Sequence, residues 1–367
     1  MKVRYSYLEQ QFRHADDLWD QLKQFVGTGA FTLGPPLVDF ENKFAELIGT
    51  NHAVGVNSGT DAIKLSLRAL GIGYGDEVIT AANTFIATVG AIAELGAKPV
   101  FVDCDDTFCM NVDEIEAVIT EKTSAIVPVH FGGYMTDMRK LLPLAEKYNL
   151  PIVEDACQSI LGAIDNKNAG TWGRAGAFSL HPLKNINVWS DGGVIVTNED
   201  ALARDLKLLR NHGLLDRDTV TVLGFNSRLD TIQAVVGNWL LPQAFDISEK
   251  RIANANYYDE NFLQLDGLRI PKRPDSFRIV YHLYIVFAEK RDALLQYCLD
   301  AGIEAKIHYP VPIYQQPALS YLGYKKGDFP VSDQHGKSMI SFPCDQHLRK
   351  NEMDYVIETV KEFYSNQ

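Results

Sequence analysis

The chain has 367 residues, 46% of them hydrophobic, which is enough to bury a large core and to form one big domain and a smaller one. Its formal net charge of -12 argues against a nucleic acid or an anionic membrane surface as partner, because both are themselves negatively charged. No stretch approaches the roughly 18 apolar residues of a membrane span, and residues 1–11 lack the apolar centre of a signal peptide, so we expect a soluble cytoplasmic protein.

The first half of the chain alternates short apolar runs with segments of helical spacing. The segment 61–70 has apolar residues every three or four positions and is followed by Gly71, which predicts a core-facing helix that ends there. Alternation of this kind is typical of an α/β domain. The predicted strands are residues 54–56, 78–81, 100–102, 126–129, 152–153, 177–180 and 194–196.

The pattern changes in the last third of the chain. A longer polar helix is predicted at 245–265, and the proline-containing stretch 267–276 follows it. Beyond that stretch we expect a small α+β unit, and we divide the chain into a large domain, residues 1–245, and a small domain, residues 246–367. The elements expected in the small unit are a strand at 279–287, a helix at 291–301, a short strand at 303–308 and a final helix at 350–364.

Two features that suggest a metal or nucleotide site are interpreted as structural. The five cysteines are scattered and form no CxxC pair, so they predict neither a disulfide framework nor a zinc site. The glycine string 71–75 resembles part of a dinucleotide fingerprint, but it follows a helix and precedes a strand, which is the wrong order. We interpret the string as a tight turn and predict no metal site.

Three segments carry candidate chemistry, and the first is the loop Asn57-Ser58-Gly59-Thr60. It follows a strand and opens a helix, so backbone amides of Gly59 and Thr60 could hold a phosphate group at the helix N-terminus. The alternative is an ordinary helix cap made by Ser58 or Thr60.

The second and third segments contribute a carboxylate and an amine. Asp155 ends an apolar strand, where it could pair with a cationic ring nitrogen, although an aspartate after a strand is also a common helix cap. Lys184 lies in a loop after a buried strand, where desolvation would release its proton and allow a Schiff base. Because most lysines are surface charges, Lys184 is a candidate only in combination with Asp155 and the phosphate loop.

Together these segments, in this order and spacing, resemble the DegT/DnrJ/EryC1/StrS sugar aminotransferases, which are fold-type I pyridoxal-phosphate enzymes. The resemblance covers nearly the whole chain and implies a large domain with a mostly parallel seven-stranded sheet and a smaller C-terminal α+β domain. Further motifs that carry it include residues 34–35, 84–85, 129–133, 224–228, 280–284 and 308–310.

The resemblance implies a role for each matching residue. Lys184 would bind pyridoxal 5'-phosphate covalently, and Asp155 would pair with its pyridine nitrogen. Gln158 would contact the phenolic oxygen of the cofactor, and Phe85 would stack on its ring.

The resemblance also implies a site shared between two subunits. Gly59, Thr60 and Ser179 would bind the phosphate, while Asn226 would reach a phosphate in the neighbouring subunit, which makes the active unit a homodimer.

Three further residues fall where relatives place groups near the substrate. They are His181, Trp189 and His308, for which a purely structural role is the alternative.

By resemblance, the reaction is a ping-pong transfer of an amino group from glutamate or glutamine to a keto or aldehyde sugar. Dehydratase relatives carry a histidine at the position of Lys184, so this lysine favours transamination. The run 181–189 most resembles that of enzymes forming 8-amino-3,8-dideoxy-D-manno-octulosonate, from the 8-oxo sugar acid, for lipopolysaccharide. The alternatives are a nucleotide-linked 3-keto or 4-keto hexose as acceptor, a sugar dehydratase, and a pyridoxal-phosphate-binding regulator without catalysis.

Overall fold

The computed structural model describes residues 1–366, and its centre is one twisted sheet. The strands occur in two groups with the orders β1-β9-β8-β5 and β3-β2-β4, and parallel bridges between Ile126 and Ile152 and between Val129 and Asp155 join β4 to β5. Only β9 runs antiparallel to its neighbours, so the predicted mostly parallel seven-stranded sheet is confirmed. The strands are β1 (His52–Val56), β2 (Glu77–Ala81), β3 (Lys98–Val102), β4 (Thr123–Val127), β5 (Val153–Asp155), β8 (Ala175–Ser179) and β9 (Gly193–Thr197).

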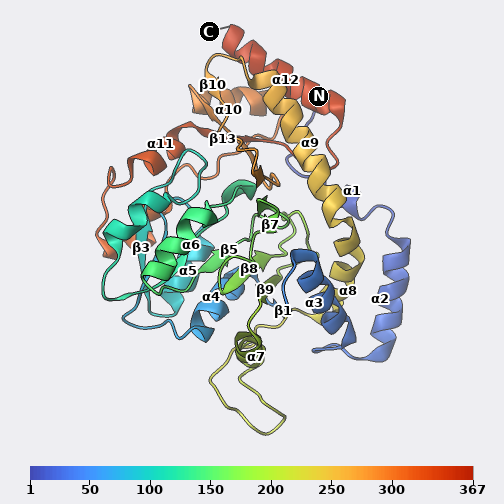
Figure 1. The fold of residues 1–367 in the computed structure, drawn as a ribbon. Helices are drawn as coiled ribbons and strands as arrows, with labels where there is room; N and C mark the ends of the chain where they lie inside the picture. Colours follow the sequence, from blue (N-terminus) through green and yellow to red (C-terminus); the bar gives the residue numbers. More distant parts are fainter. Residues whose placement is uncertain (367) are drawn as a thin grey trace.

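Helices cover both faces of this sheet (Figure 1). Successive strand residues point to opposite faces, so Val78 packs in one apolar cluster and Ile79 in the other. One face is covered by α3 (Pro35–Ile48), α6 (Met138–Lys147) and α8 (Thr231–Leu240). The other face is covered by α4 (Gly59–Ala69), α5 (Ile86–Glu94) and α7 (Asp200–Leu209).

Local sequence signals set the ends of α4. The Ser58 Oγ accepts a hydrogen bond from the Asp61 backbone N–H at 3.1 Å, which caps the first turn. Gly71, just past the last turn, has a φ of +85°, which a residue with a side chain adopts only with strain. The predicted helix and its stop are therefore confirmed.

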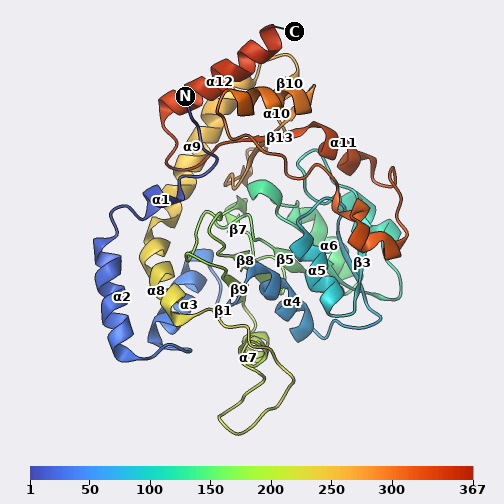
Figure 2. The ribbon, with the colours of Figure 1, turned by 180° about the vertical axis from the view of Figure 1, so that it is seen from behind.

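The second unit is built on a small antiparallel sheet of β10 (Leu268–Arg269), β12 (Tyr284–Ala288) and β13 (Met339–Phe342) (Figure 2). Its core also takes in α9 (Ala244–Phe262), α10 (Arg291–Asp300) and α12 (Lys350–Ser365). The first residues of the chain join it, because Val3 forms a parallel bridge with Ile303. The Tyr7 hydroxyl donates to Glu352 at 2.7 Å, which fastens the N-terminal segment to α12.

Shorter elements complete the chain. Near the N-terminus, α1 (Leu8–Gln11) is followed by α2 (Asp16–Thr28), which runs along the outside of α8. A small sheet of β6 (Ala163–Ile164), β7 (Lys167–Asn168) and β11 (Phe277–Arg278) connects the large sheet to the second unit. The remaining helix is α11 (Pro330–Ser338), and the 3-10 turns are residues 112–118, 131–133, 241–243, 313–315 and 317–322.

Three predicted elements of the second half need correction. The strand predicted at 279–287 begins only at Tyr284, because the backbone N–H groups of Val280 and Leu283 donate to the loop carbonyls of Gly133 and Gly132. Residues 303–308 form isolated bridges and no strand, and the helix predicted to end at 265 ends at 262. The division of the chain at residue 245 stays a prediction.

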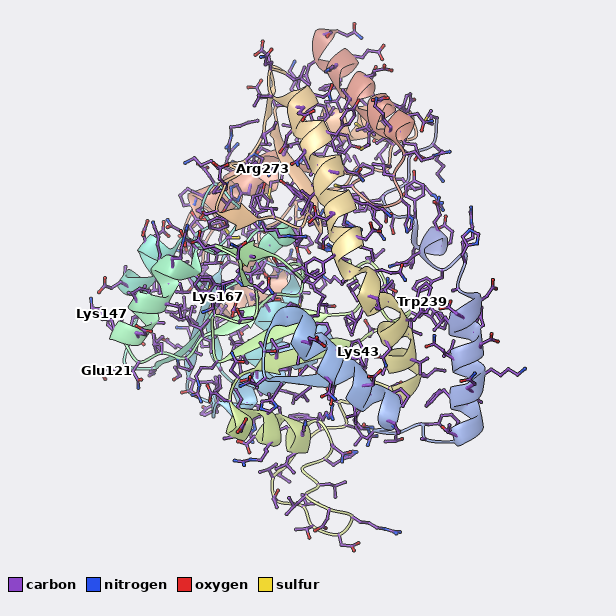
Figure 3. The ribbon with its side chains drawn as sticks, turned by 45° about the vertical axis from the view of Figure 1, so that its right-hand side comes forward. Lys43, Glu121, Lys147, Lys167, Trp239 and Arg273 are labelled. Carbon is purple, nitrogen blue, oxygen red and sulfur yellow. The ribbon has the colours of Figure 1, made fainter. Side chains whose placement is uncertain are left out.

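Charged side chains gather on the outside, as Lys43, Glu121 and Lys147 show in Figure 3. Among residues 1–366, none of the helices combines the length and apolar character needed to cross a bilayer. Within the same residues there is also no group of three histidine, cysteine or acidic side chains placed to hold a metal ion.

A buried polar cluster lies behind the end of β5. The Nδ1 of His130 accepts from the Thr136 backbone N–H, so the ring proton is on Nε2, which donates to the Glu154 carboxylate at 2.9 Å. Glu154 accepts three more hydrogen bonds, from the backbone N–H groups of Gly170, Trp172 and Gly173 at 2.7 to 2.8 Å. Both side chains are fully buried, so this carboxylate fastens the segment 170–173 to β5.

We expect Glu154→Gln to destabilise the protein by about 3 kcal/mol, because the amide would turn its own N–H groups toward donors that need an acceptor. Thermal unfolding of the full chain measures the change. Glu121→Gln is the control, since that side chain is exposed and its loss is expected to stay within about 0.5 kcal/mol. Equal melting temperatures for the two variants would contradict the cluster's structural role.

Candidate functional site

The predicted site residues come from loops at the carboxyl edge of the sheet. Parallel strands present their carboxyl ends at the same edge, where open α/β sheets bind ligands. At this edge β5 ends in Asp155 and β8 ends in Ser179, while β1 leads into Gly59. The loop after β2 brings Phe85, and the loop after β8 brings Lys184.

The loop at the start of α4 forms a tight cup with two other segments. A Cβ atom on Gly59 would lie 2.8 Å from the Sγ of Cys157 and 2.8 Å from the Cβ of Ser179, so only glycine fits. Since Ser58 occupies the Asp61 amide, the amides of Gly59 and Thr60 remain as the donors of the first helical turn. Amides at a helix N-terminus, beside the Ser179 hydroxyl, suit a phosphate group. Ser58 is therefore the helix cap, and the phosphate-binding role of Gly59 and Thr60 stays a prediction.

Asp155 is buried and held by two hydrogen bonds. Its Oδ2 accepts from the Thr88 hydroxyl at 2.7 Å, and its Oδ1 accepts from the Cys157 backbone N–H at 3.2 Å. The residues after Asp155 form turns, so the alternative in which it caps a helix is wrong. The carboxylate is 6% exposed, at the edge that also carries the cup.

Lys184 is placed among groups that affect its charge. Burial lowers the pKa of its amine, while the nearby Cys157 and Asp155 act in the opposite direction. Burial, with Lys184 and other cations nearby, holds the pKa of His282 well below its ordinary value. Burial also lowers the pKa of His308, to about 4, with Lys306 and Lys184 contributing. An amine with a lowered pKa beside neutral imidazoles is available as a nucleophile or a base.

Gln158 and Phe85 complete the cluster. The side-chain oxygen of Gln158 accepts from the Gly132 backbone N–H at 2.7 Å, which leaves its NH₂ group as the donor for a ligand oxygen. Phe85 is 50% exposed, and its ring centre lies 5.9 Å from that of Tyr309. Its ring thus offers an exposed apolar surface next to the helix whose Thr88 contacts Asp155.

Other predicted residues lie at the margin of the cluster. His181 is exposed, and its Nδ1 accepts from the Leu183 backbone N–H at 3.2 Å. The Nδ1 of His308 lies 2.9 Å from the Ser341 hydroxyl. Asn226 is exposed at the base of a long loop, where its backbone pairs with Asn211, and it stands outside the cluster.

The structure gives Trp189 a packing role. Its ring lies 5.4 Å from that of Trp19 and 5.6 Å from that of Phe12, so it contacts the N-terminal helices. The indole is still 37% exposed, which leaves one part of it open beside the lysine loop.

Sequence reasoning missed four residues of this cluster. Thr88 is one of them; its spacing of four residues from Thr84 is a weak signal, because its partner Asp155 lies 67 residues further along the chain. Cys157, His282 and Tyr309 belong to recognised motifs, but nothing in one sequence shows that they approach Lys184 or Asp155.

These residues fit pyridoxal 5'-phosphate. The cup at Gly59 suits its phosphate, the buried Asp155 suits a protonated ring nitrogen, and the Lys184 amine suits a covalent link. The free NH₂ group of Gln158 suits the phenolic oxygen, and the open face of Phe85 suits the ring. Each feature follows from local geometry in this chain.

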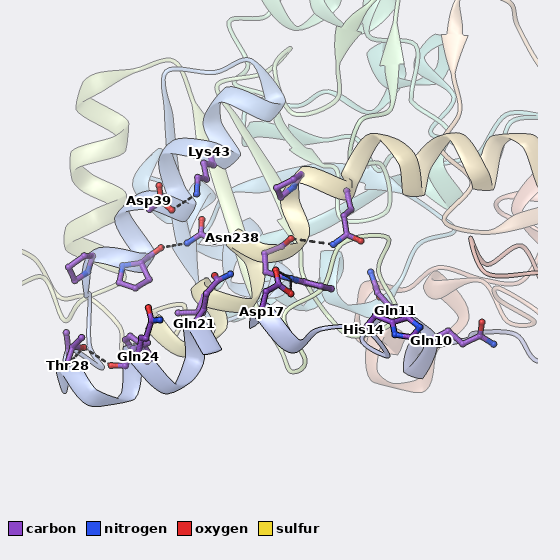
Figure 4. A pocket seen from close by; sticks show the side chains of 18 of the residues that line it. Gln10, Gln11, His14, Asp17, Gln21, Gln24, Thr28, Asp39, Lys43 and Asn238 are labelled. Atoms are coloured by element: carbon purple, nitrogen blue, oxygen red, sulfur yellow. Dashed lines mark hydrogen bonds and ion pairs between the residues drawn. The ribbon is translucent and has the colours of Figure 1, made fainter. Parts of the chain in front are cut away.

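A large open cavity lies elsewhere (Figure 4). It measures about 1230 Å³ and is lined by α2, α3 and α8, including Asp17, Lys43 and Trp239. Among the described residues, none of the predicted site residues lines it. The candidate site is therefore defined by its chemistry and its place at the sheet edge.

Comparisons with known proteins agree with this site. The sequence profile of the DegT/DnrJ/EryC1/StrS aminotransferase family matches residues 13–361. A "dTDP-3-amino-3,4,6-trideoxy-alpha-D-glucose transaminase" of Micromonospora megalomicea is 37% identical, over 98% of this chain and 97% of that protein. A "pleiotropic regulatory protein" of Geobacillus stearothermophilus is 38% identical, over 94% and 93% of the two chains.

The fold has a close counterpart among solved structures. The DesV protein of S. venezuelae, solved in complex with a ketimine intermediate, superposes with a TM-score of 0.97 at 35% sequence identity. The match covers 99% of this chain and 98% of that one.

We expect Gly59→Ala to weaken binding of pyridoxal phosphate at least about tenfold, because the added methyl group would push Ser179 and Cys157 out of the cup. Fluorescence titration of the purified protein with the cofactor measures the affinity. Gly90→Ala on α5 is the matched control, since its Cβ would meet nothing within 4 Å. If both variants bound the cofactor like the wild type, the cup would not be the phosphate site.

Proposed function

This chain belongs to the DegT/DnrJ/EryC1/StrS aminotransferase family, and we propose that it transfers an amino group to carbon 3 of a nucleotide-linked keto sugar. It is a pyridoxal-phosphate-dependent sugar aminotransferase of fold type I. The observation that carries the proposal is the Lys184 amine, desolvated and close to the buried Asp155 at the carboxyl edge of the sheet.

The cofactor, when bound, supplies an electron sink for the bond that breaks at the amino-bearing carbon. Lys184 would hold the cofactor through its amine, and the free amine would move the proton at that carbon, a task for which its lowered pKa suits it. Asp155 would keep a proton on the ring nitrogen. Its two hydrogen bonds fix the carboxylate in one orientation for that contact.

Three further contacts orient the ring. Gln158 would donate from its NH₂ group to the phenolic oxygen, and Phe85 would cover one face of the ring. The amides of Gly59 and Thr60 and the hydroxyl of Ser179 would bind the phosphate. Together these residues would hold the cofactor within reach of Lys184.

The choice of acceptor is supported by the names of relatives. Relatives at 34 to 37% identity are named for dTDP- or UDP-linked sugars that carry the oxo or amino group at carbon 3. The free 8-oxo sugar acid is the second candidate, favoured only by the run 181–189. Lipopolysaccharide biosynthesis belongs to this second candidate.

A single lysine serves both halves of the reaction, so we propose ping-pong kinetics with glutamate or glutamine as donor. In that order the donor would bind first, and its keto-acid product would leave before the sugar binds. His181, Trp189 and His308 lie around the lysine loop, and we propose that they border the sugar.

We further propose a homodimer whose sites are shared. Phe85 and Leu183, beside the site, are 50% and 49% exposed, which is unusual for apolar side chains at a catalytic centre. The loop 211–226 projects from the body below α7 and exposes Leu215 and Leu223 at its surface (Figure 2). A second copy of the chain would cover both apolar surfaces and bring Asn226 to the phosphate.

A cytoplasmic location is supported by the cysteines. Cys104, Cys109, Cys157, Cys298 and Cys344 are all unpaired, as is usual in a reducing compartment.

The acceptor is tested by two separate half-reactions. Glutamate should bleach the visible absorbance band of the loaded enzyme, and a dTDP- or UDP-linked 3-keto hexose added after its removal should restore the band. Lys184→Ala should show neither change, because its site lacks the amine that binds the cofactor and moves the proton. Mass spectrometry of the product identifies the amino sugar.

Each other outcome points to a different function. Recovery with the 8-oxo sugar acid alone would replace the proposed acceptor with the second candidate. Release of ammonia without an amino sugar would indicate a dehydratase, and no response to any amino donor would indicate a regulator.

Sharing of the site is tested by mixing two inactive variants, Lys184→Ala and Asn226→Ala, with subunit exchange. In a mixed dimer, one site receives both mutations and the other receives neither, so about a quarter of the wild-type activity should return. Mixing Lys184→Ala with Asp155→Ala is the control. Both changes lie in the same subunit's contribution to a site, so activity should stay absent. Failure of the first mixture to recover, with subunit exchange verified, would contradict a shared site.

A further inference from the structure

A chain of two hydroxyl groups leads to the carboxylate of Asp155. The Thr88 Oγ1 lies 2.7 Å from the Asp155 Oδ2, and the Thr84 Oγ1 lies 2.9 Å from the Thr88 Oγ1. A hydroxyl has one proton, and the carboxylate can only accept, so Thr88 donates to Asp155 and Thr84 donates to Thr88. Both threonines are almost fully buried, which shields the chain from competing water.

The start of the same helix also places Phe85. Phe85 is the N-cap of α5, and Thr88 lies in the first turn of that helix. The position of Thr88 relative to Asp155 therefore also sets the position of the Phe85 backbone relative to that carboxylate. The N-terminus of α5 adds a favourable field for a negative charge in this place.

The geometry points to Thr88 as a positioning residue for the cofactor, acting through Asp155. This inference rests on the proposed contact between Asp155 and the ring nitrogen. Oδ2 accepts the shorter hydrogen bond, from the Thr88 hydroxyl, and Oδ1 accepts the longer one, from the Cys157 backbone N–H. Each oxygen has two acceptor sites, so the carboxylate can still accept from a ring nitrogen. The Thr88 hydroxyl thus fixes the orientation of the carboxylate, and it links Oδ2 to the helix that follows Phe85.

The loss of the Thr88 hydroxyl has a specific consequence. Oδ2 would remain buried without its donor, which costs free energy and leaves the carboxylate less firmly oriented. A carboxylate that is less firmly oriented holds the ring nitrogen less tightly. The effect should therefore appear in cofactor binding and in the spectrum of the bound cofactor, before any turnover.

The test compares Thr88→Val with Thr88→Ser. Valine keeps the branched shape and removes the donor, whereas serine keeps the donor and removes the methyl group. We expect the dissociation constant for pyridoxal phosphate, from fluorescence titration, to rise about tenfold for Thr88→Val and less than about threefold for Thr88→Ser. Thr84→Val, which removes only the outer donor, should give a smaller rise in the same direction.

A double-mutant cycle separates this inference from the proposed role of Asp155. Asp155→Asn alone should weaken cofactor binding strongly, and adding Thr88→Val to it should cause little further loss, because the two residues act through one contact. Wild-type affinity for Thr88→Val, equal losses for the valine and serine variants, or additive losses in the cycle would each overturn the inference. Wild-type affinity for Asp155→Asn would instead overturn the proposed role of Asp155, and the inference with it.

The melting temperature of the cofactor-free protein shows whether the Thr88 hydroxyl only stabilises the fold. Thr88→Val and Thr88→Ser should melt within a few degrees of each other in that form. If Thr88→Val lowered cofactor affinity only in proportion to a lowered melting temperature, the hydroxyl would be a packing element and the inference would be wrong.

Discussion

An amine and a carboxylate, both buried at one edge of the sheet, set the main physical constraint on this protein. Removing charged groups from water costs several kcal/mol each, so the fold must supply partners for them without letting them neutralise each other. Asp155 receives its partners from α5 and from its own turn. Lys184 has its pKa lowered by burial, although Asp155 and Cys157 oppose the shift. The site thus keeps a fixed acceptor and an amine whose proton is easily lost.

The two neighbouring acidic residues of β5 have different roles, because one stabilises the fold and the other belongs to the candidate site. Successive side chains of a strand point to opposite faces, so Glu154 and Asp155 lie in different surroundings. Glu154 is enclosed by four N–H donors and fastens the segment 170–173 to the strand. Asp155 has fewer hydrogen bonds and faces the loops that carry Lys184 and Gly59. A rigid support on one face allows the other face to hold a carboxylate with spare capacity.

Much of this arrangement was predictable from sequence, because it depends on local patterns. All seven apolar runs of the first half are strands, since each strand of a sheet covered on both faces is a short continuous apolar segment. The pattern failed where apolar residues are buried by something other than a sheet. Val280 and Leu283 are covered by the Gly132 loop, and Ile303 is covered by the N-terminal segment. The role of Thr88 is likewise not visible in the sequence, because the Asp155 carboxylate that its hydroxyl contacts is 67 residues away along the chain.

The groups assigned to the cofactor and those assigned to the sugar come from different parts of the fold. This difference explains why the type of reaction is easier to infer from the sequence than the identity of the acceptor sugar. Apart from Lys184, which lies in the loop after β8, the groups assigned to the cofactor come from strand ends, helix starts and the turns next to them, whose positions follow from the sheet. The groups assigned to the sugar come from the lysine loop, from the second unit at His308 and from the contact of Trp189 with the N-terminal helices. Changes in those surfaces can alter which sugar fits without moving Asp155 or Lys184. The same argument applies to the surfaces that a second subunit would cover, which are the exposed ring of Phe85 and the projecting loop 211–226. A surface supplied by the partner can change without altering the contacts assigned to the cofactor.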